Sequence, residues 1–254
     1  MSDGLSRRAL FTLGLERLRR AEPEAPRRAP RPRPELLDEA DLHAISLAVA
    51  VTVAERCAPS PGEQVLVVRG GELEDCFGDH DALIAVTEPL ELDHHLPFDD
   101  DEFDRVLAPL APIYAENPRA AVAELFRVVR RGGVVVLAAW TRERAVGRLL
   151  EAATGWEPAV QPRLDWGDDA VMQMALLDHA DEIEITRHEL NEPWSSPEAA
   201  VEAAERALPP VAEALSAFPG ADANGLRAHA ARLVAEEGQG ELTGAWLLAV
   251  ARRR

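Results

Sequence analysis

Four short apolar runs, separated by segments of helical pattern, constrain the fold of this chain more than any other feature. The first, Gln64–Val68, is continuous and rich in valine, as expected of a strand buried on both faces of a parallel sheet. The other runs cover residues 82–86, 103–107 and 134–139. The segments 117–130 and 143–153 have the spacing of helices. Strands that alternate with helices predict a doubly wound, Rossmann-like α/β sheet, mostly parallel.

The C-terminal part of the chain extends this pattern. Residues 182–189 alternate between polar and apolar side chains, which predicts a strand, and residues 242–251 predict another. We expect these two strands to add an antiparallel edge. Ser196 followed by Pro197 predicts a helix start, so residues 196–237 are expected to form a helical insertion before the last strand.

The N-terminal residues differ in composition from the rest. Residues 1–34 carry nine arginines and four acidic residues, and residues 21–34 contain five prolines. We interpret 1–34 as a basic helix followed by a Pro/Arg-rich linker, and 35–254 as the folded domain. For residues 5–20 three hypotheses stay open: a twin-arginine export signal, a helix that docks on a partner or a membrane surface, and a weakly ordered tail. No small-residue cleavage site follows, which disfavours export.

Charge and composition exclude several classes of function. The net charge is −18, and residues 35–254 hold 18 basic and 41 acidic side chains, which would repel a nucleic-acid backbone. All 27 basic residues are arginine, so neither a lysine Schiff base nor a P-loop lysine is available. Cys57 and Cys76 lack metal-site spacing, which favours a reduced, cytoplasmic protein. No apolar run reaches the ~18 residues of a membrane span.

The segment 96–140 carries motifs of a known family. It contains Leu-Pro-Phe, a later Phe-Asp, the pattern Glu-Leu-x-Arg-Val-x-Arg-x-Gly-Gly and a terminal Trp. The matching residues are Leu96, Pro97, Phe98, Phe103, Asp104, Glu124, Leu125, Arg127, Val128, Arg130, Gly132, Gly133 and Trp140. These motifs resemble class I S-adenosylmethionine-dependent methyltransferases, in particular the type-11 or ubiquinone/menaquinone-biosynthesis group. Segments 61–66, 164–167 and 244–252 resemble other elements of that family, so the resemblance covers residues 40–254.

The resemblance implies a site for the cofactor S-adenosylmethionine at the carboxyl ends of the strands. The positions that it assigns to cofactor binding are Val68, Gly70, Gly71, Glu88, Asp93, His94 and Ala108. Glu88 stands where the family has the acid that meets the ribose hydroxyls. Asp93 and His94 stand near the segment that contacts the adenine.

The expected glycine-rich loop is altered in this chain. The three family glycines fall at Arg69, Gly71 and Leu73, so one of them is kept, and Val67 stands in place of the acid of strand 1. Glycine serves such a loop because the backbone must approach the ligand closely. The sequence therefore predicts a degenerate cofactor site.

The spacing of the first strands predicts a shortened sheet. From Val65 to Leu96 there are 31 residues, whereas two helices and two further strands would need roughly fifty. One helix and one strand are therefore missing before Leu96. The family's strand order, 3-2-1-4-5-7-6, places strand 3 at an edge, where it can be lost without interrupting the sheet. We expect a single strand outside strand 1.

Two functions are compatible with these features. The first is a methyltransferase that acts on a small molecule, with catalytic residues that the sequence leaves unknown and with the helices of 196–237 covering the acceptor. The second is a pseudo-methyltransferase that has lost cofactor binding and acts as a binding or interaction protein. His94 or His95 as a general base is a minor hypothesis, and no metal site is expected because adjacent histidines of an extended segment point in opposite directions.

The linker hypothesis predicts the result of a truncation. Residues 1–34 offer little apolar surface to bury, so their removal should leave the melting temperature of the remaining chain unchanged. Thermal denaturation of the full chain and of residues 35–254 measures this. A decrease of several degrees would contradict the hypothesis and show that the helix at 5–20 packs on the domain.

Overall fold

A computed structural model describes residues 44–68, 73, 83–87, 95–111, 115, 117–156, 164–218, 220–238 and 241–254. The segment 1–34 lies outside the described residues. So do five of the predicted site residues, namely Gly70, Gly71, Glu88, Asp93 and His94. In the part of the chain that is described, no helix is long and apolar enough to cross a membrane.

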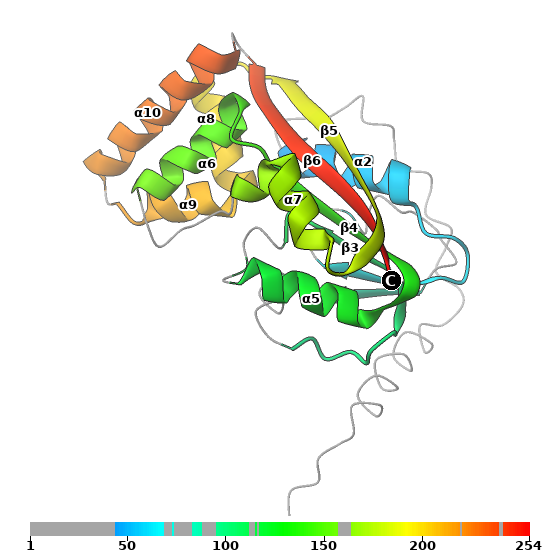
Figure 1. The fold of residues 1–254 in the computed structure, drawn as a ribbon. Helices are drawn as coiled ribbons and strands as arrows, with labels where there is room; N and C mark the ends of the chain where they lie inside the picture. The colour runs from blue at the N-terminus through cyan, green and yellow to red at the C-terminus, as the bar shows by residue number, and fades with distance from the viewer. Residues whose placement is uncertain are drawn as a thin grey trace, which may run out of the picture. The chain divides into compact units, whose positions relative to one another are not determined.

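The described strands form one six-stranded sheet in the order β2-β1-β3-β4-β6-β5 (Figure 1). Its members are β1 (Gln64–Val68), β2 (Leu83–Thr87), β3 (Phe103–Pro109), β4 (Val129–Trp140), β5 (Ala180–Pro193) and β6 (Glu241–Arg253). The first four strands are parallel, and β6 runs antiparallel to both β4 and β5. The predicted doubly wound, mostly parallel sheet with a mixed edge is confirmed.

The edge of the sheet near β2 is short, as the spacing predicts. Val67 of β1 pairs with Val86 of β2 on one side and with Leu107 of β3 on the other. Among the described strands, β2 alone lies outside β1.

Helices cover both faces of this sheet. The helix α2 (Ala44–Cys57) contacts β3, β4 and β5 on one face, and α5 (Pro118–Val128) and α7 (Asp169–Leu176) lie on the other. The remaining helices gather beyond one end of β4 and β6 (Figure 1). They are α6 (Arg144–Trp156), α8 (Pro197–Ala207), α9 (Pro209–Ser216) and α10 (Ala221–Gly238). The predicted insertion thus consists of α8, α9 and α10, of which α9 and α10 pack on α6 and α8 packs on the other two.

Local signals explain where the helices begin. The Asn117 side chain accepts a hydrogen bond from the Ala120 amide at the start of α5, and Ser196 accepts one from Ala199 at the start of α8. Proline follows both caps, where its fixed φ fits the first helical position. The start predicted at Ser196-Pro197 is therefore confirmed.

One expectation about local structure is wrong. The sequence predicts a helix through residue 130, ended by Gly132-Gly133, and a strand from residue 134, but α5 ends at Val128 and β4 begins at Val129, so both glycines lie inside the strand. The pairing of β3 with β4 shifts register there, and Gly132 has a φ of +74°, which glycine accommodates at a bulge. The sequence analysis also missed the 3-10 turn η2 (Leu164–Gly167) and α7, which Asp168 caps through the amides of Ala170 and Val171.

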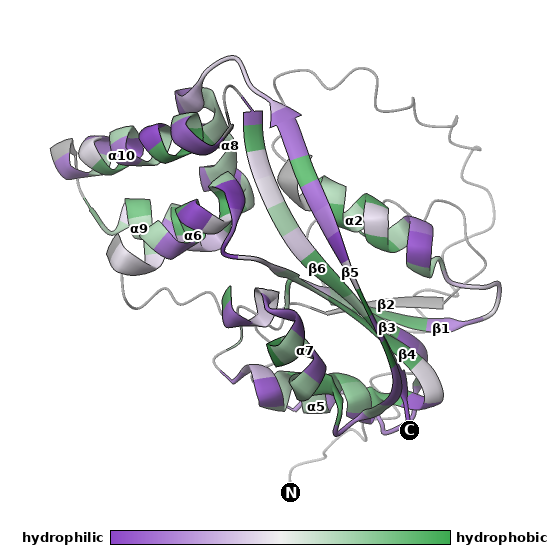
Figure 2. Cartoon of the chain, turned by 45° about the horizontal axis from the view of Figure 1, so that its top comes forward, coloured by the Kyte–Doolittle hydropathy of each residue, from purple (hydrophilic) through white to green (hydrophobic). Residues whose placement is uncertain are grey.

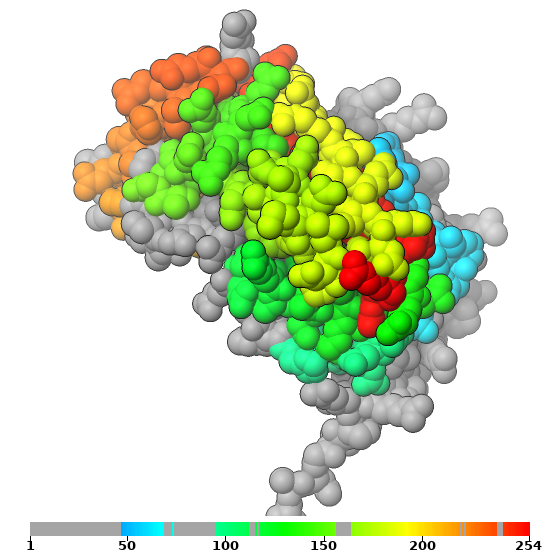
Figure 3. Space-filling view, in the orientation of Figure 1, coloured from blue at the N-terminus to red at the C-terminus, as the bar shows by residue number. Residues whose placement is uncertain are grey.

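Surface hydropathy differs among these elements. Edge strand β5 is mostly hydrophilic (Figure 2), which disfavours pairing with another sheet. Helix α7 lies at the surface in Figure 3 and, with the residue after it, carries three exposed apolar side chains, Val171, Met174 and Leu177.

The carboxyl end of β4 is packed without room for a further methyl group. A Cβ at Gly167 of η2 would overlap the carbonyl oxygen of Trp140, and one at Gly147 of α6 would overlap that of Thr141. Gly244 of β6 lies against the Trp140 ring. Three elements thus approach the end of β4 through glycine.

This packing predicts opposite effects of two alanine substitutions. Gly167→Ala should destabilise the fold by about 2–4 kcal/mol, because backbone must shift, and lower Tm by roughly 5–15 °C. Gly155→Ala is the matched control: nothing lies within 4 Å of that site in α6, so stability should rise slightly. Thermal denaturation measures both, and equal Tm values for the two variants would contradict the predicted overlap.

Candidate functional site

The candidate site is the carboxyl edge of the parallel strands, where open α/β sheets place their ligands. Val68 ends β1 and Ala108 lies near the end of β3, and the pairing of Val67 with Leu107 brings the two side by side. Both are fully buried. Of the seven residues predicted to bind the cofactor, the structure places these two together, and the other five lie outside the described residues.

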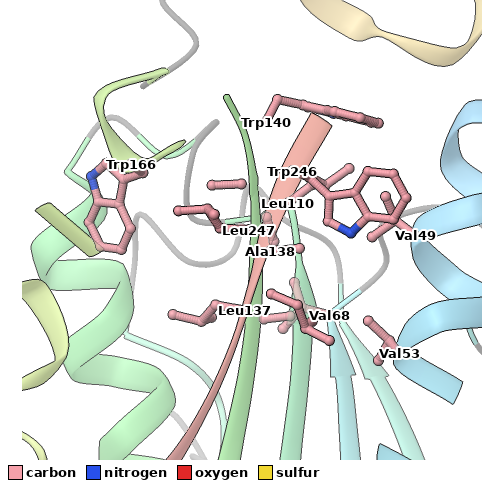
Figure 4. Close-up of a cluster of buried hydrophobic side chains, with 14 of the residues drawn as sticks. Val49, Val53, Val68, Leu110, Leu137, Ala138, Trp140, Trp166, Trp246 and Leu247 are labelled. Atoms are coloured by element: carbon pink, nitrogen blue, oxygen red, sulfur yellow. The ribbon is translucent and has the colours of Figure 1, made fainter. Parts of the chain in front are cut away.

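The described residues of this edge are apolar. Leu110, Ala111 and Ala115 follow β3 and are buried in the same hydrophobic core as Val68 and Ala108. Figure 4 shows Val68, Leu110 and Ala138 in one cluster with Val49 and Val53 of α2. Within the described residues, this part of the edge offers no charged side chain to a ligand.

The sequence resemblance assigns Leu73 to a glycine position of the family and Val67 to the position of the acid in strand 1. The structure shows that neither side chain is exposed. Both belong to the hydrophobic core. These two buried aliphatic side chains offer no polar partner to the sulfonium, amino and carboxylate groups of S-adenosylmethionine, which need such partners when buried.

Leu110 has an unusual backbone at the end of β3. Its φ is +61°, a conformation that costs a non-glycine residue about 1 kcal/mol or more. Its amide donates to the Ala138 carbonyl of β4 at 3.1 Å, and its side chain is buried. The turn that follows β3 is thus held by the packing of the Leu110 side chain and by one hydrogen bond from its amide to β4.

The best-matching family residues build a clamp at the opposite end of the sheet. The guanidinium of Arg127 donates to Glu124, to Asp100 and to the carbonyl oxygens of Leu96 and Phe98, at 2.8–3.1 Å. Glu124 also accepts the Leu96 amide at 3.0 Å. These contacts hold the segment before β3 against α5, so the motif has a structural role here.

The charge of Glu124 depends on that clamp. Partial burial pushes the pKa of Glu124 upward, but hydrogen bonds from Arg127 and the Leu96 amide outweigh this effect and lower the pKa below its ordinary value. His95 Nδ1 lies 3.2 Å from Glu124 Oε2. Because Glu124 is one turn from the end of α5, which leads into the amino end of β4, His95 lies away from the carboxyl edge.

Among the described residues, no three His, Cys, Asp or Glu side chains gather in a way that could hold a metal ion. Asp99–Glu102, which the sequence places before β3, is held by local contacts instead. The Asp99 amide donates to Glu102 at 2.7 Å, and Arg253 donates to Asp101 at 2.6 Å.

An aromatic cluster continues the apolar edge across β4, β6 and β5. Trp140, Trp246 and His188 stand opposite one another in the register of the three strands. The Trp140 and Trp246 rings meet edge to face at 5.5 Å, and His188 stacks on Trp246 at 5.6 Å. In the sequence, Trp140 is marked as the end of a motif, whereas His188 carries no such signal, although the alternation of β5 could have placed it on this face.

Comparisons with known proteins identify relatives of this fold. Residues 80–137 match the model of a family described as methyltransferase domain. An uncharacterized protein of Mycobacterium tuberculosis is 38% identical over 87 residues, 33% of this chain and 32% of that protein. An uncharacterized protein of Methanocaldococcus jannaschii is 38% identical over 56 residues, 22% and 27% of the two chains. The match thus spans about a third or less of the length of these curated relatives.

Solved structures resemble a larger share of the chain. The MccD protein has a TM-score of 0.51 at 13% identity, covering 81% of this chain and 96% of its own. A candidate methyltransferase from an antibiotic biosynthesis pathway of Anabaena variabilis has a TM-score of 0.54 at 12% identity, covering 83% and 99%. At such identity the likeness shows the fold.

The clamp predicts a pH-dependent stability. Because Glu124 has a folded pKa below the ordinary 4.5, its ionised form stabilises the fold at neutral pH, and this contribution disappears as the pH falls through the lowered folded value. Glu124→Gln should therefore cost about 1 kcal/mol near pH 7 and progressively less as the pH falls from the ordinary 4.5 through the lowered folded pKa. Exposed Glu236→Gln in α10 is the control. An offset in Tm that stays constant between pH 3 and 7 would contradict the role given to Glu124.

Proposed function

Because the chain is a homologue of class I S-adenosylmethionine-dependent methyltransferases, we propose that it keeps their fold as a binding protein and has lost their donor site. The burial of Leu73 in the hydrophobic core carries this proposal. The side chain belongs to the interior of the domain at a position where the family needs bare backbone beside the cofactor. A pseudo-methyltransferase of this kind binds a ligand or partner without transferring a methyl group.

Two further features support the proposal. Val67 supplies no carboxylate at the end of β1, and the buried residues after β3 are aliphatic. A zwitterionic sulfonium compound would lose hydration there without gaining charged partners among the described residues. The net charge of −18 also disfavours a nucleic-acid partner, and cysteine usage favours a reduced cytoplasmic location.

The match of residues 80–137 to the family model favours a second candidate, an active small-molecule methyltransferase. That segment includes Glu88, Asp93 and His94, which would hold the donor together with Gly70, Gly71, Val68 and Ala108. Helices α8–α10 would then cover the acceptor. Methyl transfer needs little beyond alignment of donor and acceptor, so this candidate requires no dedicated catalytic side chain.

Binding of the cofactor separates the two candidates. A ligand at a hundredfold excess over its Kd stabilises a protein by about 2.7 kcal/mol, which shifts Tm by roughly 5–10 °C for a domain of this size. We expect millimolar S-adenosylmethionine to shift the Tm of the full chain by less than about 2 °C. A shift of about 5 °C or more would refute the proposal and favour the second candidate.

Two variants identify the cause of either result. If the wild-type chain shows a shift, Glu88→Ala should abolish it, since the resemblance assigns the ribose contact to Glu88. If it shows none, Arg69→Gly restores one family glycine outside the described core. Leu73→Gly is unsuitable because it would remove a fully buried leucine side chain, at a cost of about 3 kcal/mol or more.

A further inference from the structure

Helix α7 is apolar on the side that faces solvent as well as on the side that faces the core. Its inner face buries Met172 and Leu176 fully. Its outer face, together with the residue that follows the helix, consists of Val171, Met174 and Leu177, which are 36%, 67% and 47% exposed. These are three of the four exposed large apolar side chains of the described residues. A surface helix usually turns polar side chains to solvent, so this outer face indicates a surface that another molecule covers.

The outer face of α7 has the spacing of a helix–helix contact. Val171, Met174 and Leu177 recur every three residues, so their side chains lie in a row on one side of the helix, about 9 Å long at 1.5 Å per residue. An amphipathic helix presents apolar side chains at the same spacing of three and four residues, and such a row can pack beside this one. Met174, the most exposed of the three, has a flexible side chain that adapts to a partner.

Carboxylates lie at both ends of the outer face. Asp165, Asp168 and Asp169 are exposed at the start of α7, and Asp178 is exposed at its end. Asp168 caps the helix by accepting two backbone amides, which places its carboxylate at the first turn. Among the described residues, no arginine forms an ion pair with any of these four acids. The surface around the apolar row is therefore negative.

The arginine at the C-terminal end of α7 does not offset this charge. Arg254 pairs with a different acid, Asp181, through Nε at 2.9 Å, and its Nη2 donates to the Leu177 carbonyl oxygen at 2.7 Å. Electrostatic complementarity thus requires a partner with basic side chains beside its apolar row.

The same charge disfavours two other molecules as cover for the outer face. Two copies of α7 packed on each other would bring acid against acid at both ends, in either orientation, in a chain with a net charge of −18. A membrane surface with anionic lipids would be repelled for the same reason.

We propose that the outer face of α7 is a docking surface for a basic amphipathic helix of a partner protein. The apolar row of that helix packs on Val171, Met174 and Leu177, and its lysine or arginine side chains lie over the carboxylates at the two ends. This inference goes beyond the proposed function, because it concerns the outer surface of α7 and holds whether or not the carboxyl edge binds S-adenosylmethionine.

Two synthetic peptides that differ only in charge test this surface. Both have leucine in an apolar row and are about 16 residues long, enough to form a helix. One carries lysine beside the row and the other carries glutamate at the same positions. We expect the basic peptide to bind the full chain roughly tenfold or more tightly at low salt, and to lose affinity as salt screens the charges.

The methionines report where the peptide binds. Of the three in the chain, Met172 and Met174 lie on opposite faces of α7. In the full chain labelled with ¹³C at its methionine methyl groups, the basic peptide should shift the Met174 resonance more than that of the buried Met172. Met174→Leu assigns the resonance and should keep the affinity, because it keeps an apolar side chain.

A polar substitution shows whether the apolar row contributes. Met174→Gln keeps the length of the side chain and adds no charge, so the affinity for the basic peptide should fall roughly fivefold or more. The side chain is exposed, and the fold should tolerate the change. Val51→Gln is the matched control, since Val51 is an exposed apolar residue of α2, and it should keep the wild-type affinity.

Two pairs of substitutions show whether the carboxylates contribute. Asp165→Asn with Asp169→Asn removes two charges beside the outer face and keeps the cap at Asp168, so the affinity for the basic peptide should fall roughly fivefold at low salt. Glu213→Gln with Glu236→Gln changes the net charge equally at exposed sites of α9 and α10. This control should keep the wild-type affinity.

Several outcomes would overturn the proposal: no shift of Met174 with the basic peptide, equal affinity for both peptides, or an unchanged affinity in Met174→Gln. In the chain without peptide, a Met174 resonance that depends on protein concentration would assign the surface to a second copy. One that changes with Phe11→Glu would assign it to residues 5–20, and one that responds to anionic vesicles would assign it to a membrane. The cofactor titration is independent of these results, because stabilisation by S-adenosylmethionine would refute the proposed function and leave this surface unaffected.

Discussion

The close approach of three elements to the end of β4 is the constraint on which the rest of the domain depends. Gly147, Gly167 and Gly244 let α6, η2 and β6 meet the backbone and ring of Trp140 and its neighbour. Because α6 starts there, the position of the helices that pack on it, α9 and α10, follows from the same contact. The Trp140–Trp246 pair is fixed by this junction, so the edge-to-face geometry of the two rings is set by backbone packing.

The two ends of the parallel sheet have opposite chemistry. The amino end is held by ionic contacts: Arg127 bridges α5 to the segment before β3, and Arg253 donates to the carbonyl oxygens of Arg127 and Val129. At the carboxyl end, the described residues after β1 and β3 are aliphatic. In an open α/β sheet the carboxyl end is the one that receives a ligand. The polar motif residues that identify the family thus stabilise the fold at the end away from the ligand.

The sequence predicts the sheet well because its strands are marked locally. Valine-rich runs such as Gln64–Val68 occur where a strand is buried on both faces, and the short spacing to Leu96 agrees with the one strand that the described residues place outside β1. The Gly132-Gly133 pair misleads because the same dipeptide can end a helix or form a bulge, and only the β3–β4 register decides. The sequence does not mark α7 clearly because its eight residues form only about two helical turns, too few for a clear apolar period.

The aromatic cluster at the carboxyl edge is less predictable from the sequence because its residues come from three different strands. No local pattern shows that Trp246 stands between Trp140 and His188, since this depends on the antiparallel register of β6 with both neighbours. The alteration of the loop after β1, by contrast, is visible residue by residue. What the structure adds is that Leu73 lies in the core, so its side chain contributes to the stability of the domain.

The burial of Leu73 bears on the proposed loss of the donor site. A surface substitution in a binding loop can be reversed at little cost, but a leucine that packs among Val67, Val68 and other core residues stabilises the fold by about 2–5 kcal/mol relative to a smaller side chain. Restoring glycine would therefore destabilise the domain before any cofactor bound. The total stability of a folded domain is only about 5–15 kcal/mol, so a loss of this size is a large part of it. A return to glycine in one step is therefore disfavoured.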